Sequence, residues 1–116
     1  ALIVIDLKSG KTRYLIENTS PMGHPNCCPA DPNLVMYNIH IKWHVVHRPW
    51  LVRSDGAGTR PAFELANGEG AGHEFWSENG QTIYAVLFDG RQPQGLWGFD
   101  ARRGQCGRDH DRFRGQ

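Results

Sequence analysis

The sequence predicts an all-β protein of about two four-stranded antiparallel sheets, of the kind that form the blades of a β-propeller. Three observations lead to this fold class: a repeat of about 47 residues, glycine-containing turns between short apolar segments, and no 3.6-residue apolar period over ten or more positions. Repeats of roughly 40 to 50 residues with four short strands are typical of propeller blades. Because a ring needs at least four blades, we expect an incomplete propeller.

Two markers define the repeat. An apolar strand leads into a polar glycine turn at Gly10, Gly58 and Gly104, at steps of 48 and 46 residues. A Gly-His pair precedes a turn and a strand at His24 and again at His73, 49 residues further on. Because these independent markers agree on the period, the sequence indicates tandem copies of one structural unit.

Each unit is expected to run strand, turn, strand, loop, strand, turn, strand. Pairs such as Asn79-Gly80 and Asp55-Gly56 supply the turns, because these residues accept positive φ in hairpins. The blade parts are expected at 1–16, 24–64 and 73–100, within a repeat region 1–104. We predict at least seven strands, near residues 2–6, 12–16, 34–39, 49–54, 82–88 and 95–100, with others near 25–28, 60–64 or 74–77.

The composition fits a soluble globular protein, with 39% hydrophobic and 22% charged residues. No run approaches 18 apolar residues, so we expect no membrane segment. The net charge of +1 conceals a basic end, since residues 101–116 hold five Arg and two Asp. Because this end has one aromatic residue, Phe113, and no RNA-binding signature, we expect a disordered tail over 105–116 and no nucleic-acid site.

Three cysteines, of which Cys27 and Cys28 are adjacent, form neither a disulfide framework nor a Cys-x-x-Cys metal motif. Reduced thiols in the cytoplasm are therefore the expectation. The chain opens without Met in the middle of a predicted strand, at Leu2-Ile3, which indicates a fragment of a longer protein.

Six histidines in 116 residues are an enrichment, and neutral imidazole is both a common metal ligand and the usual general base near neutral pH. His24 and His73 occupy equivalent places, just before the first predicted strand of each blade. In a propeller that end faces the central channel, where sites are usually built. The alternative is that each histidine ties its loop to a neighbouring backbone group.

A second cluster contains His40, His44 and His47. The spacing would place all three on one face of a helix, but the β-branched residues around them favour a strand or loop, where His40 and His44 share a face. A zinc site needs a fourth ligand at defined spacing, and none is evident. We therefore interpret His40, Trp43 and His44 as substrate-binding residues of a loop at the mouth of a site.

Aromatic residues are expected to pack between blades rather than to stack on sugar rings. They are Trp43, Trp50, Trp76, Trp97, Tyr37, Tyr84, Phe75 and Phe88. The sequence contains no motif of serine hydrolases or nucleotide-binding enzymes. Cys28 lies near His24 along the chain, which suggests a thiol–imidazole pair, but no third member of such a triad is evident.

Several of these segments resemble oligogalacturonate lyases. The likeness is carried by Gly23-His24-Pro25-Asn26, by the segment 31–37 with His40, and by Gly72-His73-Glu74-Phe75-Trp76-Ser77. More loosely, the strand and turn patterns resemble propeller repeats of the TolB type. The resemblance covers roughly residues 1–100.

The resemblance implies a seven-bladed propeller that cleaves acidic pectic oligosaccharides in the cytoplasm by β-elimination, with manganese or another divalent metal. It puts His24 at the position of the proton-abstracting base and His73 at the first metal-ligand position. A metal on the uronate carboxylate acidifies the proton at C5, which a neutral histidine can remove. The family's other metal ligands, a Gln and two His, come from a later blade.

Two hypotheses follow. The first is a metal-assisted lyase with His24 as the base and His73 as a metal ligand. The second is a non-catalytic repeat module that binds a partner or assembles with itself. Two blades leave open sheet edges, and open edges pair with other strands, so we expect self-association or a longer chain in either case.

Overall fold

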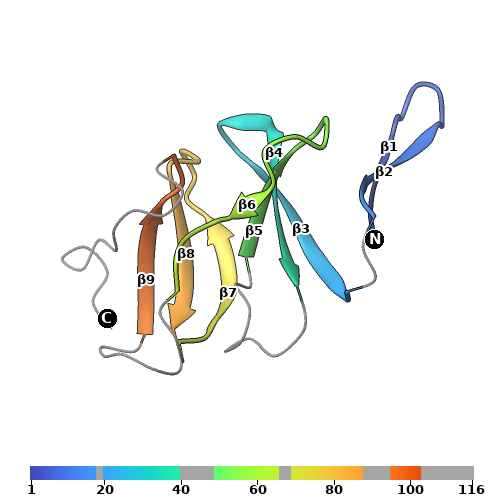
Figure 1. Ribbon diagram of the computed structural model, residues 1–116. Coiled ribbons are helices and arrows are strands. Elements are labelled where there is room, and N and C mark those ends of the chain that lie inside the picture. Colours follow the sequence, from blue (N-terminus) through green and yellow to red (C-terminus); the bar gives the residue numbers. More distant parts are fainter. Residues whose placement is uncertain (18–19, 40–48, 66–68, 88–94, 103–116) are drawn as a thin grey trace.

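The computed structural model describes residues 1–17, 20–39, 49–65, 69–87 and 95–102. Within these ranges the chain forms nine strands and no helix, so the part described also contains no helix that could cross a membrane (Figure 1). The strands are β1 (Leu2–Ile5), β2 (Thr12–Ile16), β3 (Met22–Cys28), β4 (Asp31–Ile39), β5 (Pro49–Arg53), β6 (Arg60–Pro61), β7 (Ala71–Trp76), β8 (Thr82–Leu87) and β9 (Gly95–Asp100).

The nine strands form three antiparallel sheets in chain order. We call them the first hairpin (β1–β2), the central sheet (β3–β6) and the third sheet (β7–β9). Figure 1 shows them side by side, with the central sheet in the middle. Within each sheet, every strand pairs with the next one in the chain, and the pairs are antiparallel, as short connections between neighbouring strands require. The predicted all-β fold class is confirmed. In the repeat, β1 and β2 are equivalent to β5 and β6, the last two strands of the central sheet.

The central sheet is buried on both faces. On β4, Met36 belongs to a core shared with the third sheet, whereas Val35 and Tyr37 belong to a core shared with the first hairpin. On β5, Leu51 and Val52 divide in the same way. Successive side chains of a strand point to opposite faces, so an unbroken apolar run fits a strand that is covered on both sides.

Aromatic rings help to close the interface between the central and third sheets. Phe63, which follows β6, stacks on Phe99 of β9 with ring centroids 3.7 Å apart. Trp76 is buried in the same core, as predicted. Phe75 is 45% exposed and lies against Tyr84 on the other face of its sheet, so it takes no part in the interface with the central sheet. Because Trp76 points inward, its neighbour on the strand must point the other way.

The remaining packing residues divide into two groups. Trp97 and Tyr37 are buried, and Trp50 is half-buried against the core of the first hairpin, in agreement with the prediction. Trp43, Phe88 and the predicted tail 105–116 lie outside the described residues.

Candidate functional site

The two Gly-His pairs form the same backbone irregularity in two neighbouring sheets. In the central sheet, Gly23 pairs with Asn38 and Asn26 pairs with Met36, so β3 advances three residues while β4 advances two. In the third sheet, the pairs are Gly72 with Val86 and Phe75 with Tyr84, with the same three-to-two step. The extra residue on the first strand of each sheet is a β-bulge, a feature that re-aims side chains and is frequent beside active sites.

Both histidines have a strained backbone. The φ angle is 51° at His24 and 53° at His73, and these are the two non-glycine residues with positive φ in the part of the chain that the structure describes. A side chain in this region of φ costs about 1–2 kcal/mol relative to the right-handed form. Such strain persists where the surrounding structure enforces it, and it is concentrated at functional sites. Both imidazoles are exposed.

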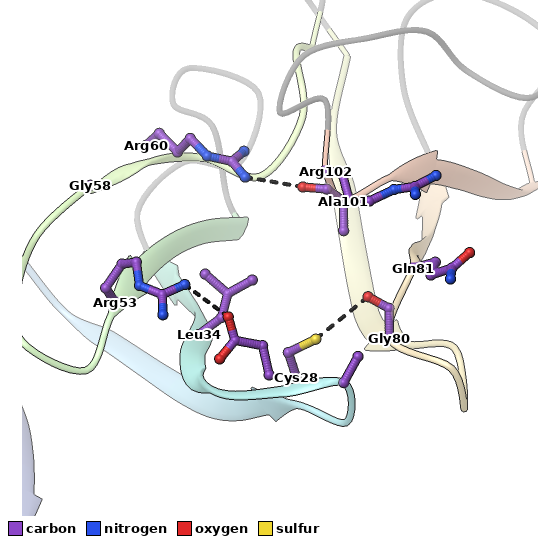
Figure 2. Close-up of a pocket in the computed structure, with 11 residues that line it drawn as sticks. Cys28, Leu34, Arg53, Gly58, Arg60, Gly80, Gln81, Ala101 and Arg102 are labelled. Carbon is purple, nitrogen blue, oxygen red and sulfur yellow. Dashed lines mark hydrogen bonds and ion pairs between the residues drawn. The ribbon is translucent and has the colours of Figure 1, made fainter.

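Contacts between β3 and β7 fix how the two bulges lie relative to each other. The Trp76 indole Nε1 donates a hydrogen bond of 3.0 Å to the carbonyl oxygen of Asn26. Further along, the Cys28 thiol donates to the carbonyl oxygen of Gly80 at 3.4 Å (Figure 2). The two first strands therefore run in the same direction with matched positions. It follows that His24 and His73 lie at the same end of their sheets.

A buried polar pair joins the two sheets at this histidine end. The Asn38 side-chain Nδ2 donates a hydrogen bond of 2.8 Å to Oε2 of Glu74, the residue directly after His73. Asn38 is 4% exposed and stands opposite Gly23, the residue directly before His24. One side-chain hydrogen bond thus joins the strand opposite the first bulge to the residue that follows His73 in the second bulge.

Sequence reasoning missed this pair, although a signal was present. Glu74 is an acidic residue inside a strand otherwise made of apolar, small and histidine residues, at the repeat position where the preceding unit has Pro25. Asn38 is a buried polar residue where the next unit has Val86. Comparison of the two repeats would have identified Glu74 and Asn38, because each is polar at a position where the other repeat has an apolar residue.

The structure corrects two predictions about this region. His24 and His73 do not precede the first strand of each sheet but lie within β3 and β7, because the strand continues through the bulge. The suggested pairing of Cys28 with His24 is wrong: the Cys28 thiol bonds to Gly80 at the opposite end of β3. Four residues of extended strand, about 13 Å, separate the two positions.

His40, Trp43 and His44, the predicted substrate-binding residues, lie outside the described residues. The segment that contains them leaves β4 after Ile39, which pairs with Met22 at the start of β3. β4 therefore ends at the histidine end of the central sheet.

The described residues do not by themselves make a metal site. Within the described ranges, no group of three or more His, Cys, Asp or Glu side chains is placed to hold a metal ion. His73 is an exposed imidazole and offers one nitrogen donor, but a tightly held divalent ion generally needs several protein ligands.

Similarity to known proteins agrees with this arrangement. The family model of oligogalacturonate lyase matches residues 1–100. An oligogalacturonate lyase from Dickeya dadantii (strain 3937) is 37% identical over 89 residues, which are 75% of this chain and 23% of that protein. An oligogalacturonide lyase from Pectobacterium atrosepticum is 34% identical over the same shares of the two chains.

Two solved structures are similar as well. A structure of an oligogalacturonate lyase in complex with manganese superposes with a TM-score of 0.77 and 27% identity, over 87% of this chain and 27% of that one. The oligogalacturonate lyase of Vibrio parahaemolyticus gives a TM-score of 0.78 and 26% identity, over 90% of this chain and 28% of the other. The chain spans about a quarter of the length of these relatives, and it belongs to the oligogalacturonate lyase family.

Proposed function

We propose that this chain supplies two neighbouring blades, and the last strands of a third, to a propeller that cleaves oligogalacturonides by β-elimination. The observation that carries the proposal is the pair of identical, strained Gly-His bulges at one end of two adjacent sheets. A repeat that needed only a packed core would have no use for a positive φ at a non-glycine residue. The family match names the reaction that such a pair would serve.

In this proposal His24 is the general base. β-Elimination on a uronate removes the proton at C5, and the electron pair forms a double bond between C4 and C5 as the bond from C4 to the glycosidic oxygen breaks. The leaving oxygen takes up a proton. Imidazole in its neutral form is the form that can accept the C5 proton.

His73 is proposed as a ligand for a divalent cation, in line with the manganese complex of a similar protein. The remaining ligands would have to come from outside the described residues. The neighbours of the two histidines support this division of roles. Glu74 follows His73 in the chain and carries a negative charge, which favours a cation, whereas Pro25 after His24 adds no charge and no side-chain hydrogen-bonding group.

We propose that His40, Trp43 and His44 contact the oligosaccharide. The support is that β4, which precedes them in the chain, ends next to Met22 and Gly23, at the same end as His24. Imidazoles donate hydrogen bonds to sugar hydroxyl and carboxylate groups, and an indole face can stack on a sugar ring.

A chimera tests the catalytic proposal. Residues 1–100 of this chain would replace the matching quarter of the Dickeya dadantii relative, so that the ring is complete. We expect manganese-dependent loss of a short oligogalacturonide and formation of an unsaturated product. A chimera that is folded by circular dichroism, binds manganese and yet does not turn over substrate would contradict the proposal.

The first hairpin favours a second proposal, that a further blade packs against this chain. One face of the hairpin packs on the central sheet, but on the other Ile3 is 50%, Ile5 54% and Tyr14 62% exposed. The central sheet is covered on both faces by neighbouring sheets, so the repeat itself indicates the kind of surface that covers this face. We propose that the occupant is another blade of the same ring.

Sedimentation of the chain at micromolar concentration tests this second proposal. An uncovered apolar face should make the isolated chain associate, and Ile5→Lys should shift it toward the monomer, whereas Lys11→Glu at the tip of the same hairpin should not. A wild-type chain that stays monomeric would contradict the proposal.

A further inference from the structure

A pocket of about 480 Å³ lies between the central and third sheets, at the end opposite the histidines (Figure 2). Its floor is formed by the end of β3 and the start of β4, where Cys28 and Leu34 line it. Gly80 and Gln81, from the turn between β7 and β8, form the facing wall. The volume falls within the range of roughly 300–1,000 Å³ that is usual for small-molecule sites.

Two arginines of the central sheet, Arg53 and Arg60, line the pocket. They differ in their hydrogen-bond partners. Arg53 is paired with Asp31 at 2.8 Å. Arg60 donates to the backbone carbonyl oxygens of Ala101, at 3.0 Å, and Pro61, at 3.4 Å, and it pairs with no carboxylate among the described residues. Arg53 ends β5 and Arg60 begins β6, and Figure 2 shows both side chains at the pocket.

Arg60 retains donors for a further partner. A guanidinium has five N–H groups, and the two carbonyl contacts use one on each terminal nitrogen. The residue is partly buried, and this burial lowers the pKa of the guanidinium. Because Arg60 is partly desolvated and has no carboxylate partner in the described part of the chain, an anion that reaches it from the pocket neutralises it most favourably, through charge-assisted hydrogen bonds.

We propose that this pocket binds a small organic carboxylate, with the carboxylate on Arg60 and an apolar body over Leu34, Ala30 and Cys28. The apolar lining selects for hydrocarbon rather than for a sugar or a bare inorganic ion. The pocket lies at the far end of β3 and β7 from His24 and His73, so this second site does not depend on the proposed lyase function.

Titration of the full chain with three probes tests the inference, with binding followed by the backbone amide signals of Leu34, Gly80 and Ala101. Hexanoate should bind saturably and shift these signals. Hexanamide, which has the same shape without the charge, should bind at least about tenfold more weakly, because a charge-assisted hydrogen bond is roughly twice as strong as a neutral one. Inorganic phosphate should not shift the same signals at equal concentration.

Variants separate the charge from the fold. Arg60→Met keeps the aliphatic stem and should weaken hexanoate binding about tenfold or more. Arg60→Lys keeps the positive charge and should retain most of the wild-type affinity for hexanoate. Lys11→Met removes the same charge far from the pocket and should change nothing. Each variant must keep the wild-type circular dichroism spectrum.

The inference is overturned by equal binding of hexanoate and hexanamide, by unchanged binding in a folded Arg60→Met variant, or by no shift of the pocket signals with hexanoate. Shifts confined to residues around His24 and His73 would likewise assign the carboxylate to the histidine end and overturn it.

Discussion

The bulges at His24 and His73 have the same backbone conformation, but the residues next to the two histidines differ. Both have φ near 50° and the same three-to-two register step. In β3 the next residue is Pro25, whereas in β7 it is Glu74, which accepts a hydrogen bond from Asn38 across the interface between sheets. The difference teaches that the repeat fixes the backbone position of each histidine, while the residue after it differs in charge and in its contacts with the neighbouring sheet.

The largest expected effect concerns the alignment of β3 with β7, on which the comparison depends. A Cβ at Gly80 would lie 2.7 Å from the backbone nitrogen of Ala30 and 2.8 Å from the Cys28 sulfur, and φ is +70°. We expect Gly80→Ala to lower the free energy of unfolding by about 2–4 kcal/mol, through overpacking and backbone strain, in urea denaturation.

Gly10 provides the matched control, because its φ is +75° but nothing lies within 4 Å of its Cβ position. Gly10→Ala should therefore show the backbone strain alone, about 1 kcal/mol. Equal losses for the two variants would mean that Gly80 does not hold the sheets in register.

The polar pair that distinguishes the two bulges should have the next largest effect. Asn38→Val introduces the residue type found at the equivalent position, Val86, and removes a buried donor from Glu74. We expect a loss of about 1–3 kcal/mol, because a buried acceptor loses its partner. A double-mutant cycle with Glu74→Ala should give a coupling of about 0.5–3 kcal/mol. A coupling near zero would show that the pair does not stabilise the interface.

The shared backbone predicts a smaller effect that is the same in both bulges. Glycine adopts positive φ without the steric cost that alanine has, so each His→Gly variant should be more stable than the matching His→Ala variant by about 1 kcal/mol. Urea denaturation of all four variants measures this. A gain at one position only would break the equivalence of His24 and His73.

The smallest expected effect lies at the other end of the sheets. The hydrogen bond from Arg53, followed by that from the Asn33 backbone, lowers the pKa of Asp31 below its ordinary 3.8. Since the folded-state pKa is the lower one, this stabilisation is present above pH 3.8 and disappears as the pH falls through the lowered value. Asp31→Asn should therefore be slightly less stable than wild type near neutral pH, and equal to it in strong acid. A difference in stability between Asp31→Asn and the wild type that does not change with pH would contradict this.

The sequence predicted what local patterns determine. Apolar runs bounded by glycine turns predicted the strands, and the 49-residue step from His24 to His73 predicted the equivalence of the two sheets. The bond between Asn38 and Glu74 joins residues 36 positions apart, and no period of a single strand encodes it. The two bulges could not be predicted from the sequence either. A positive φ at histidine follows from the pairing between strands rather than from the propensity of the residue itself.

The most direct test of the central claim, that two equivalent histidines have different roles, is to measure turnover and manganese affinity together in the chimera. His24→Ala should reduce turnover about 10²-fold or more and leave manganese affinity nearly unchanged, because a lost general base affects the proton transfer alone. His73→Ala should weaken manganese binding about tenfold or more. If both variants change the same quantity, or if His24→Ala turns over substrate normally, the division of roles is wrong.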